Sequence, residues 1–154
     1  MREGNPGTKG GFYAISSAND LALAKGALFK DDLTLALAKN AQLLYKSKSH
    51  GVIDMITMID ELGELTQGAS LADSVVGRAA ALLCVYSGIV NVYGSRMSEG
   101  ALSILKARGI HHEFGELVPR ILNRKMDDVC PFDKAVSGIE DPVAALERLR
   151  SVRL

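Results

Sequence analysis

The chain has 154 residues, enough for one domain with a real core, and its 47% apolar and 23% charged content is typical of a globular protein. Its 18 basic residues balance its 18 acidic residues, so no overall field attracts DNA, RNA or an anionic membrane. We therefore expect neither a nucleic-acid partner nor a membrane partner.

The longest apolar run, residues 79–86, falls far short of the roughly 18–20 residues that span a bilayer. The two cysteines, Cys84 and Cys130, lie in an apolar run and in a polar loop, so a disulfide is not expected. These features predict a cytoplasmic protein. Glycine, proline and lysine at the start of the chain predict a flexible leader over residues 1–18, followed by a single domain over 19–154.

The first predicted elements are a helix, a hairpin and a second helix. Asn19 or Asp20 is expected to cap a short helix that ends near residue 28. Alternating residues 33–38 and the segment 41–47 predict two strands, with Asn40 in the turn between them. Apolar spacing over residues 52–63 then predicts a helix.

The segment from Gly68 to Gly88 is predicted to be the central helix. Ser70 and Asp73 have the spacing of a capping box, and the apolar run that follows has no polar side. A helix that is apolar all round is buried all round. Its first turns carry Asp73 and Arg78, which are too far apart around a helix to pair with each other.

The rest of the chain continues the alternation of strands and helices. We expect a strand over 89–93, a helix from the cap Ser98 to Gly109, a weaker strand over 110–117 and one or two helical turns over 118–125. Pro131 and Pro142 are each expected to open a short helix. This order predicts an α/β domain, a three-layer α-β-α sandwich with a mixed sheet and helices on both faces.

Three phrases together resemble one protein family: LADSVVGRAAALL, VYGSRMSEGALSIL and ELVPRILNRKMDDVCPFDKAV. They are similar to the bacterial and archaeal family called domain of unknown function 1893, and the resemblance covers residues 20–141. It implies a cytidine-deaminase-like fold and does not imply a biochemical role.

The residue types that zinc deaminases use are missing where the resemblance would place them. Such enzymes need His or Cys with a catalytic Glu at the start of one helix, and PCxxC at the start of the next. We expect these positions to be filled by Val76, Gly77 and Arg78 and by residues 97–101, which offer no thiolate or imidazole. His111 and His112 are adjacent on a predicted strand and point to opposite faces. The sequence therefore predicts no metal and no cofactor.

Several polar residues are candidates for a ligand site at the predicted helix starts. Gly77 and Arg78, with helix N–H groups, would suit an anion, while Asp73 is a candidate catalytic acid or base. Ser98 and Glu99 would line the same cleft from the neighbouring helix. Each also has a plain structural explanation, as a cap, a first-turn acid or an ion-pair partner.

Cys130 is the most reactive-looking position, because it directly precedes a helix whose dipole favours thiolate. No histidine is near it in sequence, although the fold could bring His50 close. Asn123 and Arg124 add a small basic face that would suit a nucleotide or another anion. A semi-buried thiol and a solvated helix end are the structural alternatives.

Two functional hypotheses follow. The first is a pocket for a small nucleotide-like or anionic ligand, between the predicted helix starts at Ser70 and Ser98, with metal-independent and perhaps thiol-dependent chemistry. The second is a non-enzymatic regulatory or self-assembling module, such as a homodimer, built on the same scaffold.

Overall fold

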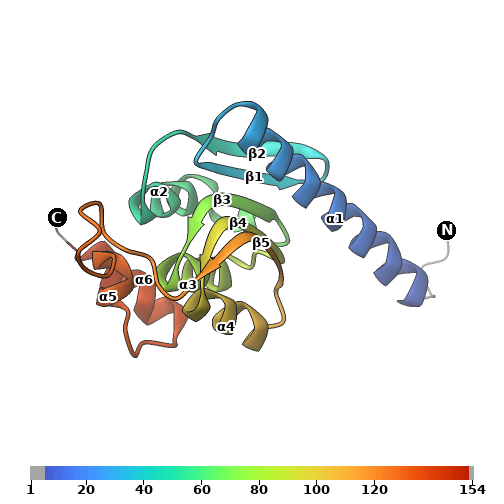
Figure 1. Cartoon of the computed structure of the whole chain (residues 1–154). Helices are drawn as coiled ribbons and strands as arrows, with labels where there is room; N and C mark the ends of the chain where they lie inside the picture. Colours follow the sequence, from blue (N-terminus) through green and yellow to red (C-terminus); the bar gives the residue numbers. More distant parts are fainter. Residues whose placement is uncertain (1–5, 153–154) are drawn as a thin grey trace.

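A five-stranded mixed sheet, ordered β2-β1-β3-β4-β5, is the centre of the computed structural model (Figure 1). Residues 6–152 are described, with side-chain surroundings from residue 17 onward. The strands are β1 (Leu35–Lys39), β2 (Gln42–Ser47), β3 (Ser70–Val76), β4 (Asn91–Ser98) and β5 (His111–Val118). The helices are α1 (Pro6–Lys30), α2 (Val52–Leu62), the 3-10 turn η1 (Gly63–Thr66), α3 (Arg78–Ser87), α4 (Glu99–Ala107), α5 (Pro131–Ala135) and α6 (Pro142–Arg150).

The two faces of the sheet carry side chains of different sizes. Alanines Ala36, Ala38 and Ala72 face α1, so the helix lies close against the strands. The alternate positions Leu35, Leu37 and Leu71 point the other way, into the core formed with α2, α3 and α4. Helices thus cover both faces, and the predicted fold class, α/β with a mixed sheet, is confirmed.

The predicted hairpin is confirmed. β1 and β2 pair antiparallel, and Asn40 and Ala41 both have positive φ, at 54° and 66°, as a tight two-residue turn requires. The carboxylate of Asp20 accepts hydrogen bonds from the backbone N–H groups of both turn residues, at 3.0 and 2.8 Å. The expected helix start at Asn19 or Asp20 is not found, since α1 begins at Pro6 and both residues lie within it. Residues 1–5 of the predicted leader lie outside the described residues.

The segment from Gly68 to Gly88 is a strand followed by a helix, and the prediction of one long helix is wrong. β3 pairs antiparallel with β1 and parallel with β4, so it is the strand where the sheet changes direction. The supposed cap Ser70 instead donates to the Ser17 carbonyl and accepts from the Asn91 amide, both at 3.0 Å. A strand covered on both faces has no alternation, so periodicity does not distinguish it from a buried helix.

The remaining helices mostly follow the predictions. The N-cap Ser98 accepts from the Ala101 N–H at 3.1 Å, and Gly109 has φ of 69° just past the end of α4. Pro131 and Pro142 each begin a helix as expected. The buried half of the predicted central helix is α3, which α2, α4 and α6 surround.

The predicted helical turns over 118–125 are not formed. β5 ends at Val118, and the chain then makes a loop in which Leu122 and Val129 form an isolated bridge. Asn123 and Asp127 close this loop by a pair of hydrogen bonds at 2.9 and 3.1 Å, which compete with helix formation. None of the described helices is both long and apolar enough to cross a bilayer.

Candidate functional site

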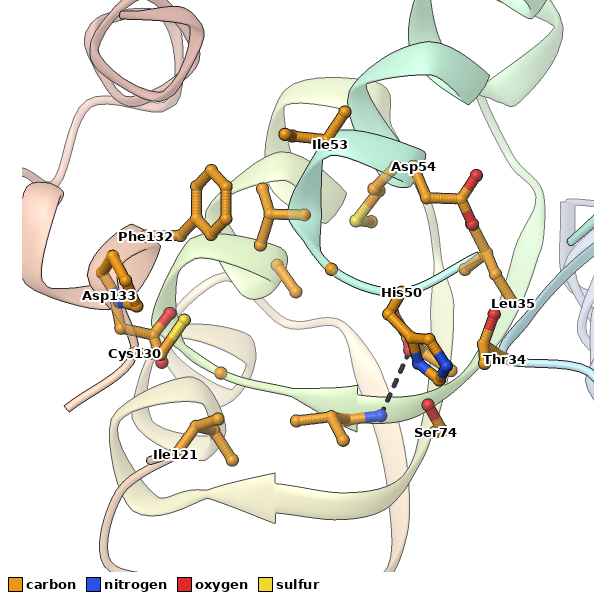
Figure 2. A pocket seen from close by; sticks show the side chains of 18 of the residues that line it. Thr34, Leu35, His50, Ile53, Asp54, Ser74, Ile121, Cys130, Phe132 and Asp133 are labelled. Carbon is orange, nitrogen blue, oxygen red and sulfur yellow. Dashed lines mark hydrogen bonds between the residues drawn. The ribbon is translucent and has the colours of Figure 1, made fainter. Parts of the chain in front are cut away.

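A cavity of about 690 Å³ lies at the end of β3, beside the start of β1 (Figure 2). The beginnings of α2 and α3 border it, and the segment from Ile121 to Asp133 forms a further wall. β3 lies between an antiparallel and a parallel neighbour, so the cavity lies at the strand where the sheet changes direction.

The walls combine apolar surface with carboxyl groups. Ile53, Ile121 and Phe132 supply apolar side chains. Asp54, Asp73 and Asp133 supply the carboxyl groups of the wall, and His50 and Arg124 supply its basic side chains. The lining is thus richer in acidic than in basic groups.

Asp73 is the most perturbed of these carboxyl groups. It lies on β3 opposite Leu35 of β1, on the face that packs against α2 and α3. Its pKa is raised to about 7: burial is the largest cause, the negative charge of Asp54 adds to the rise, and the Val75 N–H, which donates to Oδ1 at 3.1 Å, lowers the pKa. The side chain still reaches the cavity, so at neutral pH it can give or accept a proton there.

Asp54 is held in place by a tyrosine. It lies in the first turn of α2, where the helix dipole favours a carboxylate, and its Oδ1 accepts from the Tyr45 hydroxyl at 3.2 Å. Burial and the negative charge of Asp54 raise the pKa of Tyr45, so the phenol stays a donor. The sequence argument missed Asp54, although an acid in the first turn of a predicted helix was a visible signal.

The N–H groups at the N-terminus of α3 already have an acceptor within the chain. Asp133, from α5, accepts from the Ala79 N–H at 2.8 Å and so caps the helix from a distant segment. Burial raises the pKa of Asp133, while hydrogen bonds from the Ala79 and Arg78 N–H groups oppose that rise. A Cβ on Gly77 would meet Asp133 Oδ2 at 2.1 Å, so only glycine fits beside this carboxyl. The sequence argument did not identify Asp133 as a site residue.

Arg78 does not line the cavity. Its Nε donates to the Val136 carbonyl at 3.0 Å, and its Nη2 donates to the Ile139 carbonyl at 2.5 Å. The guanidinium thereby fastens the segment after α5 to the start of α3. Gly77, by contrast, does line the cavity.

Ser98 and Glu99 are also outside the cavity lining. They lie at the start of α4, where Ser98 caps the helix and Glu99 occupies its first turn. The predicted site between two helix starts at Ser70 and Ser98 is not formed, because Ser70 begins a strand. The helices whose first turns do open onto the cavity are α2, α3 and α5.

Cys130 lines the cavity, as does His50, which the sequence argument named as a residue that folding could bring near (Figure 2). Burial raises the pKa of the Cys130 thiol, and the negative charge of Asp133 adds to the rise. Backbone N–H groups at the start of α5 oppose it without reversing it. The predicted shift toward thiolate is therefore wrong. The other thiol, Cys84, is fully buried, and burial raises its pKa strongly.

Asn123 and Arg124 contribute to the wall from the loop after β5. The Asn123 amide is engaged with Asp127, and Arg124 is exposed. Among the described residues, no group of three or more His, Cys, Asp or Glu side chains could hold a metal ion. The absence of metal and of cofactor stays a prediction.

The chain is similar to several solved structures. The first is a DUF1893 family protein (TM1506) from Thermotoga maritima, with 25% identity, a TM-score of 0.79, and coverage of 86% of this chain and 89% of that one. The second, RibD from Acinetobacter baumannii, has 20% identity, a TM-score of 0.46, and coverage of 67% and 35%.

The third structure is a diaminohydroxyphosphoribosylaminopyrimidine deaminase/5-amino-6-(5-phosphoribosylamino)uracil reductase from Thermotoga maritima. It has 14% identity, a TM-score of 0.43, and coverage of 80% of this chain and 40% of that one. No curated protein matches the sequence. Residues 23–152 match the family described as TM1506, domain of unknown function (DUF1893), and the TM1506 structure has the same overall fold. The chain therefore belongs to the DUF1893 family.

Proposed function

We propose that the cavity binds a small nucleoside-like ligand whose hydrogen-bond donors, or positive charge, meet Asp73. The observation that carries this proposal is a carboxyl group with a pKa of about 7 lining a cavity of about 690 Å³. Ligand pockets are commonly about 300–1,000 Å³. Strongly perturbed carboxyl groups in clefts are enriched at functional sites.

The shape of the ligand follows from the apolar walls. Ile53, Ile121 and Phe132 offer surfaces against which a flat ring can lie, and Asp73 offers a polar partner for its edge. A ring with amine or amide groups satisfies both parts of the lining.

An anionic group is a poorer match for the inner part of the cavity. Asp54 and Asp73 would repel it. Asp133 already accepts hydrogen bonds from the N–H groups at the start of α3, so these donors are not available to an anion. Arg124, exposed in the wall, is the cation that a phosphate would meet. A nucleoside should therefore bind at least as well as the corresponding nucleotide.

Any reaction in this cavity would use Asp73 and Asp54 as an acid–base pair. Asp73 is half-protonated near pH 7, while Asp54 is oriented by the Tyr45 hydroxyl. Two carboxyl groups in different environments can divide the roles of proton donor and proton acceptor.

The test is a thermal-shift and calorimetric screen with free nucleobases, nucleosides and the matching nucleotides. We expect one of these probes to stabilise the wild type, and we expect the affinity to fall about 10- to 100-fold in Asp73→Asn, since a hydrogen bond to a charged group contributes about 1.5–3 kcal/mol. The matched control is Asp31→Asn, which alters an exposed aspartate at the end of α1.

Equal affinity in Asp73→Asn and in the wild type would sink the assignment of Asp73. A screen in which no probe stabilises the wild type would sink the nucleoside-like ligand.

A further inference from the structure

We propose that the open edge of β5 pairs with β5 of a second copy, in antiparallel orientation, so that the protein is a symmetric dimer. β5 is the last strand of the sheet, and its hydrogen-bonded neighbour is β4. The cavity lies at β3 and takes no part in this proposal.

The two edges of the sheet differ in how well they are protected. β2, at one edge, carries the exposed Lys46 and is followed by Lys48, and its register with β1 shifts between Leu37 and Ala38. Lysines and irregular register are the usual means by which proteins block edge pairing. β5 contains no lysine, arginine or proline, and its pairing with β4 is regular.

β5 also exposes large apolar side chains. Phe114 is 40% exposed and Leu117 is 38% exposed. Phe114 lies opposite Gly94 of β4, so its ring has no side chain beside it on that strand. An edge strand that lacks lysine, proline and a bulge and exposes apolar side chains is suited to pairing with another strand.

The order of side chains along β5 makes a second copy the fitting partner. His112, Phe114 and Glu116 share one face of the strand. If two copies of β5 pair antiparallel with a twofold axis at Phe114, the two Phe114 rings lie opposite each other. His112 of each copy then lies opposite Glu116 of the other. Because His112 Nδ1 lies 2.9 Å from the Ile110 carbonyl oxygen and donates to it, Nε2 is left to meet Glu116, and the imidazolium form of His112 pairs with that carboxylate. The polar pattern is then its own complement, as a twofold interface requires.

The other charged group of the strand does not oppose this pairing. Glu113 lies on the opposite face, where Lys25 Nζ donates to it at 2.8 Å and His111 Nε2 lies 3.1 Å away. Glu116 has one ion-pair partner in its own chain, Arg96, at 3.5 Å, and both side chains stay largely exposed.

The test is sedimentation velocity or light scattering over a concentration series. We expect a concentration-dependent dimer for the wild type and a loss of at least about 100-fold in dimer affinity for Phe114→Glu, because two carboxylates would replace two rings at the centre. The control is Leu65→Glu, which adds the same charge at a 57% exposed leucine of η1.

A charge exchange between half-buried His112 and exposed Glu116 tests the register. His112→Glu alone places two carboxylates opposite each other and should weaken the dimer. Glu116→Lys alone removes the carboxylate that faces His112 and should weaken it as well. The double variant His112→Glu/Glu116→Lys restores opposite charges and should regain the lost affinity.

A wild type that stays monomeric at every concentration would overturn the proposal, as would a dimer that Phe114→Glu leaves intact. A double variant no tighter than either single variant would overturn the antiparallel register centred on Phe114. Circular dichroism on each variant separates loss of the dimer from loss of the fold.

Discussion

Asp73 holds a half-buried carboxyl group near a second carboxyl, and this arrangement destabilises the fold whenever Asp73 is ionised. Its pKa of about 7 lies above the ordinary value of 3.8, so the folded state binds the proton more tightly than the unfolded state does. The contribution of Asp73 to stability is therefore complete at acidic pH and declines as pH rises from about 4 to about 7.

Asp73→Asn should remove this decline. Between about pH 4 and about pH 8, the unfolding free energy of the variant should rise by about 2–4 kcal/mol relative to that of the wild type. Urea unfolding at a series of pH values measures it, with Asp31→Asn as the control. A difference that does not change with pH would show that Asp73 has an ordinary pKa in the folded protein.

At this scale the sequence identified some site residues and misplaced others. Asp73, Gly77, Asn123, Arg124 and Cys130 do line one cavity, although they were proposed around a helix start that does not exist. Arg78 was misjudged because its partners are backbone carbonyls far along the chain, which no local pattern reveals. Asp133 and Asp54 gain their surroundings only from tertiary packing.

At the scale of elements, individual turn, cap and proline residues predicted the boundaries of helices and strands correctly. The hairpin turn at Asn40, the cap at Ser98 and the prolines at the start of α5 and α6 depend on backbone geometry that neighbouring residues impose. β3 was misjudged because its environment is set by β1 and β4 on either side, and an apolar segment fits a buried strand or a buried helix equally well.

The junction between α3 and α5 gives a prediction at the scale of elements. Gly77→Ala should lower the unfolding free energy by about 1–3 kcal/mol, because its Cβ would overlap the Asp133 carboxylate and force α5 away. In an Asp133→Ala background the same change should cost less than about 1 kcal/mol, since the obstructing oxygen is gone. Chemical denaturation of the wild type, the two single variants and the double variant measures this double-mutant cycle.

Gly100→Ala is the matched control for this cycle. It adds a methyl group in α4 whose nearest neighbour would be at an ordinary 3.9 Å, and alanine favours the helix, so stability should hold or rise slightly. If Gly77→Ala costs the same with and without the Asp133 carboxylate, the close approach is not the cause.

Across the whole molecule, α1 is joined to the sheet by polar contacts as well as by apolar packing. Asp20 binds the hairpin turn, while the Ser17 carbonyl accepts from Ser70 and from the Asn91 amide. Asp20, Ser70 and Asn91 are buried, so each would be costly to leave unpaired. The layer order of the fold therefore depends on specific contacts at the ends of the strands.

Asp20→Ala should lower the unfolding free energy by about 2–3 kcal/mol, because it leaves the N–H groups of Asn40 and Ala41 without their acceptor. Hydrogen exchange at these two amides should accelerate, while amides in α3 keep their protection. Asp31→Ala, at an exposed position, is the control. Unchanged exchange at Asn40 and Ala41 would mean that Asp20 does not hold the turn.

The cap that Asp133 places on α3 also bears on how the chain is made. The acceptor for the Ala79 N–H comes from a residue 54 positions later in the sequence. During synthesis, the first turn of the core helix lacks that acceptor until α5 has left the ribosome and docked. The same late segment therefore both caps the core helix and lines the cavity.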